Sequence, residues 1–143
     1  MQPRLGDSVE LELPLQPQLF FLARMTAAAI ASHANFDPQQ IDDLRLGVDE
    51  LLLTLTRDLI RSDDASSFIR VEFQWHVDVM DVAATLVGGA GEPLATQAPD
   101  TAREDTERSI SESILEAVVD EHGAGGPGEV PRVWLRLRRS SAL

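Results

Sequence analysis

The feature that most constrains the fold is a long amphipathic segment over residues 37–61. Its apolar residues recur every three or four positions, the spacing that lines one face of an α-helix. They are Ile41, Leu44, Val48, Leu51, Leu52, Leu55 and Leu59. Asp37 before Pro38 provides an N-cap and a proline at the first helical position, and the polar run 62–66 ends the pattern. We therefore expect one long helix with a buried face.

Runs of alternating apolar and polar residues lie on both sides of this segment and predict strands. One run covers residues 9–14 and ends at a proline, which lacks a backbone N–H and is compatible with a sheet edge. Residues 69–75 and 81–87 follow the long helix closely enough to pair as a hairpin with its turn near 77–80. A last alternating run covers residues 133–138.

Two further helices are expected, over residues 18–32 and from about 103 to 121. In the first, one apolar stripe is predicted, and Arg24 falls outside it. The stripe consists of Leu19, Leu22, Met25, Ala29 and Ile30. The predicted buried side of the later helix consists of Ile110, Ile114, Leu115, Val118 and Val119. Loops rich in glycine and proline are expected over 88–101 and 123–131.

The order of these elements is β-α-α-β-β-α-β, which places neighbouring strands in hairpin-like succession rather than in repeated βαβ units. This order favours an α+β two-layer sandwich, with a mixed, mostly antiparallel sheet and helices on one of its faces. The 143 residues suit one domain with a single core, spanning residues 1–143.

Composition narrows the classes of function. The chain has 24 acidic and 12 basic residues, all of the latter arginine, and a net charge of −12. This charge repels nucleic-acid backbones and favours a basic protein partner, although it can equally serve solubility alone. Cysteine is absent, and the widely spaced His33, His76 and His122 predict no metal site. With neither a membrane-length apolar run nor a signal-peptide core, we expect a cytoplasmic protein that does not bind a membrane.

Within the long predicted helix, residues 43–54 resemble the first ATP-site motif of RsbW and SpoIIAB. These proteins are anti-sigma factors and serine-protein kinases, and they have the ATP-binding fold of the GHKL group, which includes gyrase B and histidine kinases. Four more segments match the family in order and spacing, so the resemblance covers nearly the whole chain. They are residues 10–14, 22–26, 84–93 and 115–121. The resemblance implies the GHKL fold.

In active members of this family, the helix carries a glutamate that positions or deprotonates the attacking serine hydroxyl. An asparagine four residues later helps to hold Mg²⁺, and this spacing puts both groups on one helix face. The corresponding residues are Glu50 and Thr54. The Thr54 hydroxyl cannot reproduce the reach of a carboxamide oxygen. An alternative remains open, in which Glu50 is only a solvated charge on a helix face.

The next motif of active kinases is Asp-x-Gly-x-Gly, whose aspartate binds the adenine amino group. Residues 87–91 keep Gly89 and Gly91, but Val87 replaces the aspartate, a loss worth about 1–3 kcal/mol of ligand binding. Where the last motif presents Gly-x-Gly, counting back from Asp120 places residues 109–111, which are Ser-Ile-Ser. The resemblance thus implies a degenerate ATP site that binds ATP and Mg²⁺ weakly or not at all. The glycine run can equally be an ordinary loop.

Arg24 matches a position on the first helix that SpoIIAB-like proteins use to contact both the sigma factor and the anti-anti-sigma protein. The resemblance therefore implies a homodimeric anti-sigma factor of a sigma-F or sigma-B type stress-response circuit. Such a protein sequesters its sigma factor and is released by an anti-anti-sigma factor of the STAS type, here without efficient kinase activity. The competing interpretation of Arg24 is an ordinary solvated arginine.

Two other functions remain open. The chain could be an active ATP-dependent serine kinase that phosphorylates an anti-anti-sigma factor despite its altered motifs. It could also be an ATPase-like accessory domain of another signalling system. Stabilisation by Mg-ATP would indicate the kinase. A lack of affinity for any sigma factor would indicate the accessory domain.

Overall fold

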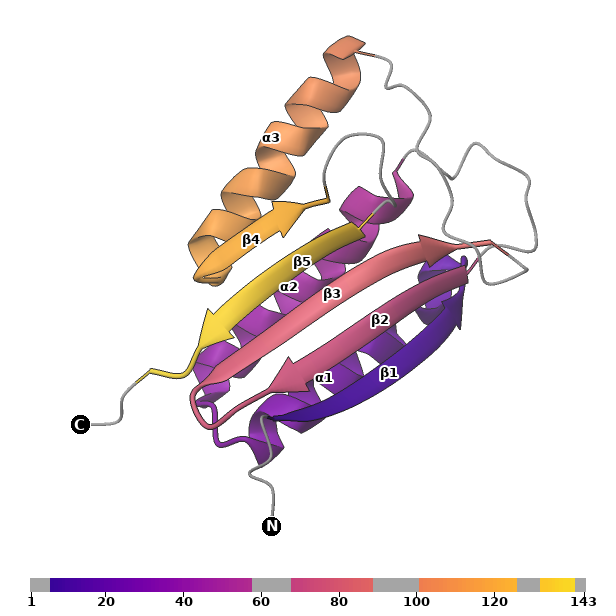
Figure 1. Cartoon of the computed structure of the whole chain (residues 1–143). Coiled ribbons are helices and arrows are strands. Elements are labelled where there is room, and N and C mark those ends of the chain that lie inside the picture. The colour runs from indigo at the N-terminus through magenta and orange to yellow at the C-terminus, as the bar shows by residue number, and fades with distance from the viewer. Residues whose placement is uncertain (1–5, 58–67, 89–100, 126–131, 141–143) are drawn as a thin grey trace.

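The computed structural model describes residues 6–57, 68–88, 101–125 and 132–140, and of residues 101–108 only the backbone. Within these residues a five-stranded sheet carries the helices on one face (Figure 1). The elements are β1 (Asp7–Pro14), the short 3-10 helix η1 (Pro17–Leu19), α1 (Phe21–His33), α2 (Pro38–Thr56), β2 (Phe68–Trp75), β3 (Val79–Val87), α3 (Thr101–Val118), β4 (Glu121–Ala124) and β5 (Arg132–Arg138). None of these helices combines the length and apolar character that a membrane span requires.

The sheet has the strand order β1-β2-β3-β5-β4, and each neighbouring pair described is antiparallel. The predicted α+β two-layer sandwich is therefore confirmed, and it is compatible with a GHKL-like fold. β1 lies at a sheet edge, and β2 and β3 form the predicted hairpin. The single domain over residues 1–143 stays a prediction.

Alternation along the strands separates the two faces of the sheet. On β2, Ile69, Val71 and Phe73 are buried on the helix-covered face, while Arg70 and Glu72 point to the opposite face. Successive side chains of a strand point to opposite faces of the sheet, because the period of a strand is two residues. The hydrophobic core therefore lies between the sheet and the helices, and the outer face of the sheet is polar.

The long helix α2 starts where the sequence predicts. The side chain of Asp37 accepts a hydrogen bond from the backbone N–H of Gln40 at 2.8 Å and one from the Ser140 hydroxyl at 2.8 Å. These bonds, the first above all, hold the pKa of Asp37 below its ordinary value. Asn35 has a φ of 64° and turns the chain between α1 and α2, a conformation that asparagine tolerates.

The apolar stripe predicted for α1 is wrong except at Ile30, which is buried. Leu22 and Met25 are 37% and 59% exposed, and Ile30 shares the buried face with Ala23, Ala27 and Ala31. Small side chains allow α1 to approach the layer beneath it closely, so the alanines occupy the buried face and larger residues remain outside. Both stripes have helical periodicity, and Ile30 belongs to both.

The end of the third predicted helix also differs from the sequence expectation. α3 ends at Val118, and residues 121–124 form the edge strand β4, which pairs with β5. Leu115 and Val119 are buried as predicted, but Ile110 is 56% exposed. The strand was missed because its four residues include Gly123 and show no clear alternation.

Candidate functional site

The two predicted ATP-site residues of α2 lie on the side of this helix that faces α3. A Cβ on Gly47 would lie 3.1 Å from Val119 Cγ1, next to the end of α3. Ten residues later, Arg57 Nη2 donates a hydrogen bond of 2.7 Å to the Ser111 hydroxyl of α3. Glu50 and Thr54 fall between these two contacts at helical spacing. The structure therefore places Glu50 and Thr54 together along the interface between α2 and α3, which we call the α2–α3 seam.

The hydroxyl of Thr54 is enclosed by the protein. Its Oγ1 is buried and has no hydrogen-bond partner among the described residues, whereas Thr56 Oγ1 donates to the carbonyl of Leu52 at 2.7 Å. A buried hydroxyl without a partner costs about 1–3 kcal/mol. Glu50 is half-buried nearby on the same side of α2. Thr54 thus presents no exposed oxygen at the position where an active relative places its asparagine.

The predicted nucleotide motif begins at the end of β3. Val87 is 1% exposed and stands opposite Phe68 of β2, and Gly88 is also buried. Gly89 and Gly91 lie outside the described residues. The side chain of Val87 offers no acceptor, so it cannot bind an adenine amino group.

The position predicted for the last motif is not a loop. Ser109 and Ser111 lie inside α3, where a backbone N–H bonds to a carbonyl one turn earlier and is unavailable to a phosphate. Ser111 is 3% exposed and accepts the hydrogen bond from Arg57. Residues 109–111 therefore offer no open backbone to a phosphate, and their equivalence to the last motif stays a prediction.

The described residues offer few donors at the positions predicted to hold Mg-ATP. Among them, no three histidine, cysteine or acidic side chains gather to hold a metal ion. The predicted positions hold one half-buried carboxylate, an enclosed threonine hydroxyl and a buried valine. Oxygen donors in the correct number and geometry are what Mg²⁺ requires. Weak or absent ATP binding stays a prediction.

Arg24 lies on the opposite side of α2, where α1 and α2 pack together. Its Nη1 is 2.6 Å from Asp49 Oδ1, and the two side chains are 36% and 31% exposed. Asp49 was not singled out from the sequence, because the two residues are 25 positions apart on different helices. Arg24 is therefore a half-exposed arginine held by an ion pair rather than a freely solvated one.

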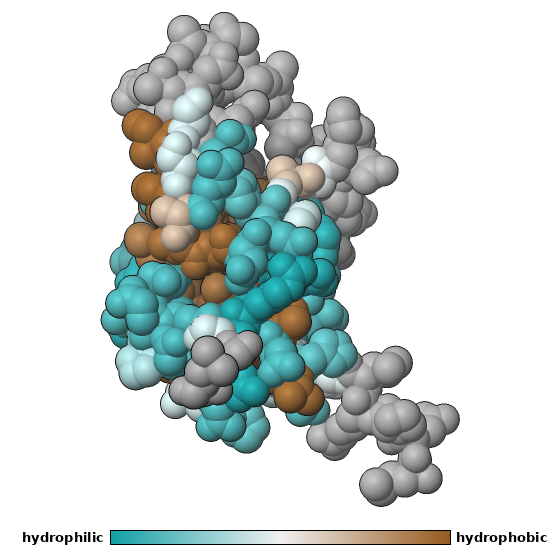
Figure 2. Space-filling model, turned by 90° about the vertical axis from the view of Figure 1, so that its left-hand side faces the viewer, coloured by the Kyte–Doolittle hydropathy of each residue, from teal (hydrophilic) through white to brown (hydrophobic). Residues whose placement is uncertain are grey.

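Apolar side chains remain at the surface of the helix layer. Leu46 and Leu53 of α2 are 45% and 40% exposed, and Ile110 of α3 is exposed more than either. Figure 2 shows apolar side chains gathered on the side of the molecule where α3 lies. Exposed apolar groups near charged ones are typical of protein-binding surfaces.

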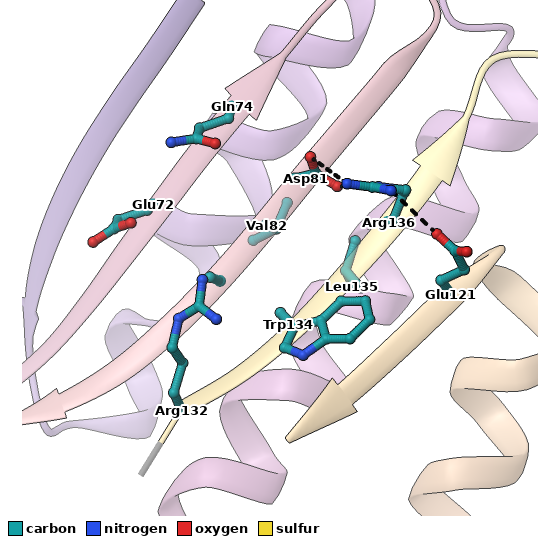
Figure 3. A pocket seen from close by; sticks show the side chains of 10 residues that line it. Glu72, Gln74, Asp81, Val82, Glu121, Arg132, Trp134, Leu135 and Arg136 are labelled. Carbon is teal, nitrogen blue, oxygen red and sulfur yellow. Dashed lines mark hydrogen bonds and ion pairs between the residues drawn. The ribbon is translucent and has the colours of Figure 1, made fainter. Parts of the chain in front are cut away.

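The outer face of the sheet contains a hollow of about 470 Å³ above Ala83 (Figure 3). Ala83 stands between Glu72 of β2 and Trp134 of β5 in the register of the sheet, and its small side chain leaves the space open. The Trp134 ring extends over Gly123 of β4, where an added Cβ would lie 2.7 Å from Cζ2. The hollow therefore has a tryptophan wall on one side and a carboxylate on the other.

Charged side chains border this hollow. Arg136 Nε is 2.7 Å from Asp81 Oδ1, and Arg136 Nη1 is 3.5 Å from Glu121 Oε2 (Figure 3). The hydrogen bond and charge of Asp81, with a smaller effect of Glu121, raise the pKa of Arg136. Arg132 lies on the same face of β5 and is exposed. The basic strand β5 thus lies beside acidic groups on its neighbouring strands.

Comparison with known proteins identifies relatives of the chain. No protein-family model matches it. It is 30% identical over 76 residues to the serine-protein kinase RsbW of Listeria monocytogenes, an alignment that covers 53% of this chain and 48% of that protein. It is 23% identical over 125 residues to the serine-protein kinase RsbW of Bacillus licheniformis, which covers 87% of this chain and 71% of that protein. The alignment thus spans about half the length of the Listeria protein. These similarities confirm the resemblance to RsbW.

Proposed function

We propose that this relative of RsbW is a cytoplasmic anti-sigma factor that sequesters an alternative sigma factor by direct binding. An anti-anti-sigma factor of the STAS type would release it by competing for the same surface. The observation that carries this proposal is the position of Arg24 at the surface between α1 and α2, half-exposed and beside uncovered apolar side chains. Arginine next to apolar groups is enriched among the residues that dominate protein–protein affinity.

The residues along the α2–α3 seam support binding without efficient phosphorylation. Glu50 alone retains the identity that serine kinases of this type use, and its role would be vestigial. Thr54 and Val87 replace the groups that hold Mg²⁺ and adenine, and both present buried atoms where a donor or acceptor is needed. Several such losses, at about one decade of affinity per 1.4 kcal/mol, separate this chain from a kinase that binds nucleotide tightly.

The proposal is tested by surface plasmon resonance against the purified alternative sigma factors of the source organism. Without nucleotide, the wild-type chain should bind one of them, and Arg24→Ala should weaken that binding at least about thirtyfold because a hot-spot arginine contributes about 2 kcal/mol or more. Addition of Mg-ATP should not change the affinity of the wild-type chain. Higher salt should slow association more than it speeds release, since the long-range attraction is electrostatic.

A matched control for this variant is Arg139→Ala. Arg139 forms one ion pair, 2.9 Å from Asp78, and is 33% exposed, close to the value for Arg24. It should leave sigma binding unchanged. Binding that requires Mg-ATP would favour the active kinase, and the absence of any sigma binding would favour the accessory-domain alternative.

We also propose that the chain forms a homodimer through the outer face of its sheet. Charge complementarity supports this arrangement, because the exposed Arg132 of β5 and the carboxylate of Glu72 on β2 flank the same hollow. A two-fold axis would place Arg132 of one protomer opposite Glu72 of its partner. Trp134 would fill the contact. In sedimentation velocity, Trp134→Ala should weaken self-association at least about thirtyfold, whereas Val77→Ala in the hairpin turn should not. A wild-type chain that stays monomeric at high concentration would contradict this arrangement.

A further inference from the structure

We propose that Asp49 positions Arg24 for partner binding, and that the surface around this ion pair accepts one amphipathic helix bearing a carboxylate among apolar side chains. The inference rests on the proposed function, in which Arg24 contacts the partner. It adds a second residue to the surface and a chemical description of the segment that binds there.

The Arg24–Asp49 ion pair marks the point where α1 and α2 meet. Because it joins the two helices, residues up to four positions from either partner lie within about 6 Å of it along the helix axes. On α2 these include Leu46 and Leu53, which precede and follow Asp49 by three and four residues and are 45% and 40% exposed. Two apolar residues therefore flank Asp49 on the same helix face.

The exposed apolar residues of α1 next to Arg24 are arranged differently. Leu22 precedes Arg24 by two residues, Met25 follows it directly, and the two are 37% and 59% exposed. Both belong to the stripe that the sequence predicted to be buried. At about 100° per residue, Met25 lies about 100° and Leu22 about 160° around α1 from Arg24, so neither shares its helix face. We call Leu46, Leu53 and the ion pair the α1–α2 surface.

The chemistry of this surface describes its occupant. A guanidinium carries five N–H donors, and among the described residues Arg24 contacts Asp49 through Nη1, so other donors remain for an incoming acceptor. A carboxylate suits this position because a guanidinium can bind it through two parallel hydrogen bonds. An acidic group on the partner is therefore expected at the centre of the contact.

The spacing of the apolar residues favours a helix over an extended strand. Leu46 and Leu53 are seven residues apart on α2, about 10.5 Å along its axis. A second helix presents apolar side chains at the same spacing on one face, which is how amphipathic helices dock on helical surfaces. The partner segment would therefore carry apolar residues about seven positions apart, with the carboxylate between them.

Asp49 contributes by restricting Arg24 before binding. A free arginine side chain loses rotamer freedom when it is immobilised in an interface, and this loss weakens the complex. In the structure the ion pair at 2.6 Å already holds the guanidinium at the helix surface. Removal of Asp49 should therefore weaken partner binding even though Asp49 itself donates nothing to the partner.

The test measures the affinity of the full chain for the sigma factor that the wild-type chain binds. Asp49→Ala should weaken binding about three- to tenfold, and in an Arg24→Ala background the same change should have no further effect. Asp49→Asn, which keeps an acceptor oxygen, should recover part of the loss. Melting temperatures of these variants should stay close to that of the wild type, because an ion pair this exposed contributes little to stability.

A charge swap separates positioning from stability. Arg24→Asp combined with Asp49→Arg restores an ion pair between the two helices but reverses the polarity of the surface, so binding should remain lost while the fold is retained. The matched control is Asp78→Ala, which removes the carboxylate of the ion pair with Arg139 and should leave affinity unchanged. Leu46→Glu and Leu53→Glu should each weaken binding more than tenfold if an apolar helix face docks there.

The outcomes distinguish this inference from the proposed function. If Arg24→Ala weakens binding and Asp49→Ala leaves it unchanged or tightens it, Asp49 does not position Arg24, and the inference fails while the proposed function stands. Unchanged binding of both leucine variants would overturn the helical occupant. If the wild-type chain binds no sigma factor, the proposed function fails and the inference fails with it.

Discussion

Replacing Phe73 by alanine should lower the free energy of unfolding by about 3–5 kcal/mol. Phe73 is fully buried in β2, between Val9 of β1 and Val82 of β3 in the register of the sheet. The change removes apolar surface from the core and leaves a cavity that the strands on both sides cannot close. A domain of this size has about 5–15 kcal/mol of stability in total, so the variant would lose a large part of it.

Urea denaturation followed by circular dichroism measures this loss. Gln74→Ala is the matched control, because Gln74 is the next residue of the same strand and its exposed side chain points to the outer face. It should change the stability by no more than about 0.5 kcal/mol. An equal loss in both variants would mean that the alternation of β2 does not separate a core face from a solvent face.

The fold could be predicted from sequence wherever a pattern is carried by large residues. α2 has leucine and valine at helical spacing and an unambiguous N-cap at Asp37. Its leucines and valine from 44 to 55 that were predicted to be buried are buried, Ile41 is half-buried, and Leu59 lies outside the described residues. The face of α1 could not be predicted in the same way, because alanine contributes little to an apolar pattern although it allows close packing. Leu22 and Met25 are exposed for that reason. On this helix, close packing favours burial of the face with small alanines, whereas hydrophobicity favours burial of the face with Leu22 and Met25.

The candidate site was predictable only where its residues are close in sequence. Glu50 and Thr54 lie four positions apart on one helix, and their shared side of α2 follows from helical geometry alone. The ion pair between Arg24 and Asp49 depends on how two helices pack, which periodicity does not determine. Enclosure of the Thr54 hydroxyl likewise depends on tertiary packing. The features of the site that could not be predicted from the sequence are those that depend on contacts between residues far apart in the chain.

Replacing Val87 by aspartate restores the residue that active kinases of this type use for adenine, and it should destabilise this chain. Val87 is 1% exposed at the end of β3. Burial disfavours the charged form of a carboxylate, so the pKa of the new aspartate should rise above its unfolded value of about 3.9, by about 3 units or more for a fully buried group. At pH 7 the loss of stability should reach about 4 kcal/mol.

The sign of the pH dependence identifies the cause. Because the folded state binds the proton more tightly than the unfolded state, the variant should be most stable below about pH 4, and it should lose about 1.4 kcal/mol per pH unit as the pH rises toward the folded pKa. Val87→Asn is the control: its polar side chain should lower stability by about 1–3 kcal/mol without adding this slope. Denaturation curves of both variants between pH 4 and pH 7, corrected for the wild-type slope, measure the difference.

Addition of Mg-ATP to the Val87→Asp variant tests the adenine position directly. A ligand that binds only the folded state stabilises it in proportion to the logarithm of its concentration over its dissociation constant. Since Thr54 still lacks an accessible oxygen for the metal, Mg-ATP should raise the melting temperature of the variant by less than about 1 °C. A rise of several degrees would mean that one aspartate is sufficient to recover nucleotide binding, and that the valine, rather than the threonine, accounts for the degenerate site.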